Sequence, residues 1–86
     1  MESRERFARN LRYVRLRAGL SQEALGYSCG LHRTEISLLE RGGRDPRLST
    51  VLRLAGALEI SPGELLSGIN GAPPRSSQAR RRPSPP

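Results

Sequence analysis

The sequence has no lysine, one cysteine and one histidine, and only 3% of its 86 residues are aromatic. One cysteine cannot form an internal disulfide bond, and Cys29 with His32 cannot complete an ordinary structural zinc site. The apolar runs are too short for a transmembrane helix or a signal peptide. We therefore expect a small cytoplasmic protein with an aliphatic core and with no metal, cofactor or membrane contact.

Positive charge is abundant. Fifteen arginines oppose eight acidic residues, so the net charge is +7, which indicates a polyanionic partner. Residues 1–69 hold eleven of these arginines and all eight acids, whereas residues 70–86 hold four arginines, five prolines and no acid. We expect residues 1–69 to form one domain and residues 70–86 to form a disordered tail. The run from Arg80 to Arg82 fits either a solvated tail or an arm that attracts phosphates.

Apolar residues recur at helical spacing through residues 1–69, and no sustained alternation of period two is present. The pattern predicts helices over residues 3–17, 22–29, 33–41 and 48–58, and a short fifth helix from Pro62 through Leu66. The fold class is therefore all-α. The expected core residues are Phe7, Leu11, Val14, Ala18, Leu25, Cys29, Ile36, Leu39, Leu48, Val51, Leu52, Ala55 and Leu58.

The stretch "SQEALGYSCGLHRTEISLLERG" fits either two ordinary packed helices or a helix-turn-helix. Its spacing favours the second interpretation. Gly26 stands where two crossing helices approach closely, and Gly30 stands where the turn needs a positive φ angle. Ile36 and Leu39 then anchor the second helix to the core. All four positions together predict a helix-turn-helix.

Residues 7–66 resemble the phage repressor and Cro-like family, also called the xenobiotic-response-element type. The matching segments are "LRYVRLRAGLSQEAL", "GLHRTEISLLERG", "DPRLSTVLRLAGAL" and "ISPGELL", in the family's order. The resemblance implies a compact five-helix bundle of the lambda-repressor-like type. It also implies a bacterial or phage-encoded, nucleoid-associated transcriptional regulator. We expect a repressor that binds a palindromic operator in double-stranded DNA as a homodimer.

The resemblance further implies which side chains contact DNA. The helix over residues 33–41 becomes the recognition helix, with its N-terminal end toward the bases of the major groove. Arg33 suits a bidentate contact with guanine, although a solvated helix surface would carry the same residue types. The base-reading candidates are Arg33, Thr34, Ser37 and Leu38. The backbone-contact candidates are Gln22, His32, Arg41, Arg44 and Arg47.

Two structural roles also follow from the resemblance. Arg15 and Glu40 match positions that pair across the first and third helices, so we expect an ion pair there. Three residues near the end of the domain, Leu65, Leu66 and Ile69, are the candidates for the dimer interface, although Leu65 also fits a position in the core.

Four positions depart from the family pattern. Cys29 replaces a larger aliphatic residue, and Leu38 is apolar where the helix is expected to face DNA, so it contacts either a thymine methyl group or a partner. His32 stands where the family has Ser or Thr capping the third helix, and imidazole is a poor substitute. Either Glu35 compensates by reaching back to the His32 amide, or His32 itself approaches DNA. Glu59 stands where the family often has glycine after the fourth helix, so we expect a turn that is either strained or differently shaped.

We expect no enzymatic activity, because His32 has no catalytic partners and "RGGRDP" lacks the strand, lysine and spacing of a phosphate-binding loop. A second class of regulator stays open beside the repressor. Antitoxins, which also bind a toxin, and controller proteins of restriction–modification systems use this same compact domain. A toxin gene or a restriction-enzyme gene beside this one would distinguish them.

Overall fold

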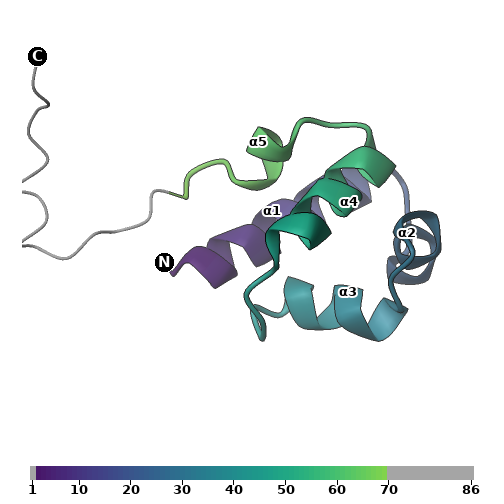
Figure 1. Ribbon diagram of the computed structural model, residues 1–86, viewed down its shortest axis with the longest axis horizontal. Coiled ribbons are helices and arrows are strands. Elements are labelled where there is room, and N and C mark those ends of the chain that lie inside the picture. Colours follow the sequence, from purple (N-terminus) through teal and green to yellow (C-terminus); the bar gives the residue numbers. More distant parts are fainter. Residues whose placement is uncertain (1, 70–86) are drawn as a thin grey trace, which may run out of the picture.

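The computed structural model describes residues 2–69, so the predicted tail, residues 70–86, lies outside the described part. Helices account for the regular structure of this part, which contains no strand. None of these helices is long and apolar enough to cross a membrane. The five helices (Figure 1) are α1 Ser3–Arg17, α2 Gln22–Cys29, α3 Arg33–Glu40, α4 Leu48–Leu58 and α5 Pro62–Leu65.

The helices place α3 and α5 at opposite ends of the described part of the molecule. Helix α3 lies at one end and α5 lies at the other, with α1 and α4 between them (Figure 1). Helix α2 packs against α3 and α4, and α3 also packs against α1. The all-α five-helix bundle expected from the sequence is therefore present. The predicted boundaries hold, except that α3 ends at Glu40, with Arg41 as its C-cap, and α5 ends at Leu65.

The core is aliphatic apart from Phe7 and the small Cys29. Three of the core assignments are wrong, because Leu48 and Leu52 are 73% and 50% exposed and Ala18 is exposed. Leu54, which the pattern analysis left out, is fully buried. Helix α4 buries positions spaced by three and four residues, which form one helical face, and its remaining leucines face outward. The buried residues of α4 are Val51, Leu54, Ala55 and Leu58.

Glu59 ends α4 in the left-handed conformation, with φ 57° and ψ 44°. It is the one non-glycine residue with positive φ among the described residues. Such a conformation costs an L-residue about 1–2 kcal/mol. Of the two expected alternatives, the strained turn is therefore present.

Replacing Glu59 with glycine is expected to stabilise the domain by about 0.5–1 kcal/mol. The variant removes the left-handed penalty and loses part of that gain to glycine's greater backbone entropy in the unfolded chain. Urea unfolding followed by circular dichroism measures the change. Glu59→Ala is the control, because it removes the charge but keeps the Cβ. An equal gain in both variants would show that charge, and not backbone strain, is responsible.

Candidate nucleic-acid interface

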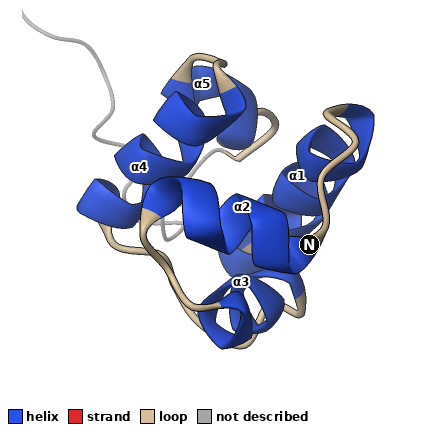
Figure 2. Cartoon of the chain, turned by 90° about the vertical axis from the view of Figure 1, so that its right-hand side faces the viewer, coloured by secondary structure: helices blue, strands red, loops and turns tan. Residues whose placement is uncertain are grey.

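The turn between α2 and α3 depends on two glycines. A Cβ at Gly26 would lie less than 3.0 Å from the backbone carbonyl oxygen of Leu31, so α2 and the following turn approach too closely for a side chain. Gly30 ends α2 in the left-handed conformation at φ 75°. These two positions set the crossing of α2 over α3 that Figure 2 shows. The close approach and the positive φ are those that the sequence predicted.

The far end of α3 is tied to α1 by the expected ion pair. Arg15 Nε donates to Glu40 Oε2 at 2.6 Å, and Arg15 Nη2 donates to Glu40 Oε1 at 2.9 Å. The two side chains are 7% and 2% exposed. Arg15 Nη1 also donates to the Leu20 carbonyl at 2.7 Å. The hydrogen bond to Glu40 raises the pKa of Arg15 above its usual value, against the opposing effect of burial.

The same carboxylate holds Gln22, the first residue of α2. Gln22 Nε2 donates to Glu40 Oε1 at 3.1 Å. The sequence did not indicate this bond, since the two residues are eighteen positions apart. A carboxamide nitrogen has two hydrogens, so one hydrogen remains for another acceptor. Gln22 is therefore oriented before any ligand arrives.

One shallow surface hollow gathers five of the predicted DNA contacts from α2 and α3. They are Gln22, Arg33, Thr34, Ser37 and Arg41.

Leu38 is not among the residues that line this hollow. It is half-buried, and its side chain lies beside Gly43 in the following loop.

His32 caps the beginning of α3. Its Nδ1 accepts a hydrogen bond from the Thr34 backbone amide at 3.0 Å, so the imidazole takes the role of a Ser or Thr cap. The Glu35 carboxylate accepts a bond from Arg44 Nη1 at 2.6 Å, and the cap bond of α3 comes from His32, not from the alternative in which Glu35 compensates. The residue that departs from the family pattern thus performs the usual capping function with a different atom.

A second hollow, lined by charged side chains of both signs, lies beside the beginning of α4. Its polar lining consists of three arginines, two acids and two hydroxyl-bearing residues: Arg44, Arg47, Arg53, Glu35, Asp45, Ser49 and Thr50. Helix α4 has no side-chain cap, so its first amides are available to an acceptor. The sequence analysis missed Arg53, which reaches the α2–α3 turn beside Gly30. Arg53 is the one basic residue within α4 and lies on its exposed side, and this feature could have identified it from the sequence.

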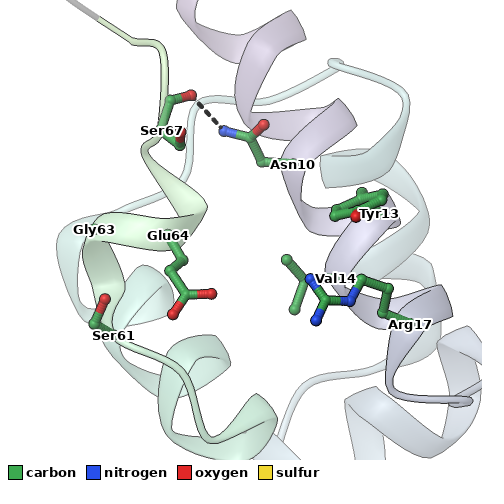
Figure 3. Close-up of a pocket in the computed structure, with 8 residues that line it drawn as sticks. All are labelled: Asn10, Tyr13, Val14, Arg17, Ser61, Gly63, Glu64 and Ser67. Atoms are coloured by element: carbon green, nitrogen blue, oxygen red, sulfur yellow. Dashed lines mark hydrogen bonds between the residues drawn. The ribbon is translucent and has the colours of Figure 1, made fainter.

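Helix α5 lies against α1 at the end of the molecule opposite α3. Asn10 Nδ2 donates to the carbonyl oxygen of Leu65 at 2.8 Å. It also donates to the carbonyl oxygen of Ser67 at 2.9 Å, the bond drawn in Figure 3. Leu65 is fully buried in the core of the single chain, which leaves Leu66 and Ile69 as the candidates with surface to offer a partner. Leu66 is 41% exposed, and Ile69 is a partly buried residue packed against the core.

No three metal-ligating side chains lie close enough together in the described part to hold a metal ion. Cys29 is buried, and this burial raises the pKa of its thiol. Its position in the core fits a role as a small apolar side chain.

Comparisons with known proteins agree with this geometry. Control protein C.SmaI of Serratia marcescens is 45% identical over 67 residues, which span 78% of this chain and 80% of that protein. The crystal structure of the restriction–modification controller protein C.AhdI from Aeromonas hydrophila has a TM-score of 0.72 and 43% identity, covering 73% and 91% of the two chains. The DNA-binding domain of the P22 C2 repressor has a TM-score of 0.68 and 34% identity, covering 72% and 82%. Residues 11–65 match the family Helix-turn-helix, and the chain belongs to that family.

Proposed function

We propose that this protein is a repressor of transcription that binds a two-fold symmetric operator in double-stranded DNA as a homodimer. The observation that carries the proposal is the hollow where Gln22, Arg33, Thr34, Ser37 and Arg41 meet. Arg33 and Thr34 begin α3, and the N-terminal residues of a recognition helix are those that reach base edges. The protein acts in the cytoplasm, on the nucleoid, and we propose no catalytic role.

The base contacts in this proposal come from α3. Arg33 is exposed and donates two parallel hydrogen bonds to guanine. Thr34 and Ser37 offer hydroxyls on the same side of the helix. Leu38 contacts a thymine methyl group with the part of its side chain that remains exposed.

The backbone contacts surround these residues. Gln22 uses its remaining amide hydrogen for a phosphate oxygen, at the N-terminal end of α2. Arg41 borders the same hollow, and Arg47 precedes α4. Arg44 is bound to Glu35 by an exposed ion pair, which contributes little by itself, so a phosphate can replace that partner. His32 completes the predicted set.

A second candidate is a controller of a restriction–modification system. It is favoured by the similarity to C.AhdI, whose title names it a restriction–modification controller protein, and to the control protein C.SmaI. A restriction-enzyme gene next to this one would identify the controller. The antitoxin stays a prediction, and a neighbouring toxin gene would support it.

Dimer formation is expected to depend on Leu66. Leu66→Glu places a charge on the proposed interface, and we expect the variant dimer to dissociate about tenfold more readily than the wild-type dimer. Ile69 and the exposed Leu48 and Leu52 are further apolar candidates for the contact. Sedimentation with and without duplex DNA measures the species. Leu16→Glu, at a leucine of α1 that is 53% exposed, is the matched control. Wild-type protein that stays monomeric on DNA would contradict the proposal.

A further inference from the structure

The imidazole of His32 is fixed in one hydrogen-bonding state by its position. Its Nδ1 accepts from the Thr34 amide at 3.0 Å, and a ring nitrogen accepts only through a lone pair. A proton on Nδ1 would face the amide proton directly. It would also bring positive charge to the helix end that is already positive. The cap therefore requires a neutral ring with its single proton on Nε2.

This arrangement leaves a donor pointing away from the helix. Nε2 is joined to Nδ1 through one ring carbon, Cε1, so its N–H points away from the amide that Nδ1 accepts from, and the His32 side chain is exposed. His32 shares a shallow hollow with Glu23, Tyr27, Leu31 and Arg33, and Arg33 also borders the hollow proposed to face DNA. The His32 ring thus lies on the same stretch of surface as the leading base-reading residue. A Ser or Thr cap uses its oxygen on the amide and lacks this second, distant donor.

We propose that His32 has two roles at once: Nδ1 caps α3, and the Nε2–H donates a hydrogen bond to a phosphate oxygen of the operator backbone. The inference rests on the proposed function, since the acceptor is DNA. It identifies the donor atom and makes the contact a neutral one. His32 is thereby distinguished from the arginines around it, which contact phosphate as cations.

The tautomer is tested without DNA. The chain has one histidine, so a long-range ¹H–¹⁵N correlation spectrum of the imidazole contains one ring system. At neutral pH we expect an Nδ1 shift typical of an unprotonated nitrogen and an Nε2 shift typical of a protonated one. A spectrum of the Nδ1–H tautomer, or of a protonated ring, would overturn the inference.

The phosphate contact is tested with His32→Ser. Serine keeps a capping oxygen and removes the Nε2 donor, so the melting temperature is expected to stay unchanged. Affinity for a duplex selected by the full chain from a random-sequence pool is expected to fall about tenfold. The slope of log K against log salt is expected to stay the same, because no cation is removed. His32→Ala is the comparison variant, with both lower stability and lower affinity.

The other outcomes have separate meanings. Equal affinity of wild type and His32→Ser would overturn the inference and leave His32 as a cap only. Weaker binding with a slope that falls by about 0.9 would show a protonated contact and would also overturn it. If wild-type protein selects and binds no duplex at all, the proposed function fails and this inference fails with it.

Discussion

Replacing Arg15 with alanine is expected to destabilise the domain by about 3–5 kcal/mol. The variant leaves the Glu40 carboxylate, whose side chain is 2% exposed, with Gln22 as its one remaining side-chain donor among residues 2–69. An uncompensated buried charge of this kind is among the largest effects of a single substitution. Small domains have about 5–15 kcal/mol of stability in total. We therefore expect a large fall in the melting temperature.

Urea unfolding of wild type, Arg15→Ala and Arg4→Ala tests this expectation. Arg4 and Asp45 form an exposed pair at 3.4 Å, with side chains 42% and 72% exposed, so the loss at Arg4 is expected to be under about 1 kcal/mol. The double variant Arg15→Met/Glu40→Met removes both charges and is expected to recover much of the stability. Equal losses at Arg15 and Arg4 would show that the buried pair has no special role.

Replacing Arg33 with alanine is expected to weaken binding to the selected duplex about 10- to 100-fold. Affinity for a scrambled duplex is expected to change much less, because the lost bonds go to base edges and not to phosphates. Arg33 is exposed and borders the hollow where α3 begins, so the melting temperature is expected to stay unchanged. Fluorescence anisotropy at one stated salt concentration measures both affinities.

Arg33→Lys is the matched control for charge. Lysine keeps the positive charge but lacks the planar fork that makes two parallel bonds. We expect most of the discrimination between the two duplexes to be lost in this variant. Equal losses on selected and scrambled DNA in Arg33→Ala would mean that Arg33 contacts the backbone, and the assignment to base reading would be wrong.

The helices were predictable because their ends carry local signals. Ser21 accepts a bond from the Ala24 amide at 2.9 Å, and Gly30 terminates α2 in the left-handed conformation. The inward face of α4 was less predictable, since leucines occur at positions 48, 52, 54 and 58 around the helix. Local spacing alone does not say which of them the other helices cover. Packing selected Leu54 and left Leu48 and Leu52 exposed.

The candidate interface was likewise predictable from the sequence only in part. The resemblance named its residues, but the bonds that orient them join distant parts of the chain. Gln22 depends on Glu40, and Arg53 reaches the α2–α3 turn from α4. His32 differs, because the departure from the family pattern was visible in the sequence while its solution, an Nδ1 cap, needed the geometry of the ring.

Selection of DNA by the full chain from a random-sequence pool tests the central claim most directly. Two recognition helices related by a two-fold axis read half-sites about 10–10.5 base pairs apart, or a multiple of that spacing. We predict an enriched consensus made of two inverted half-sites at such a spacing. Each half-site should contain a guanine, the base that Arg33 is proposed to contact. The account would be contradicted if no consensus emerged after several rounds of selection and the amount of DNA bound changed with salt concentration but not with DNA sequence.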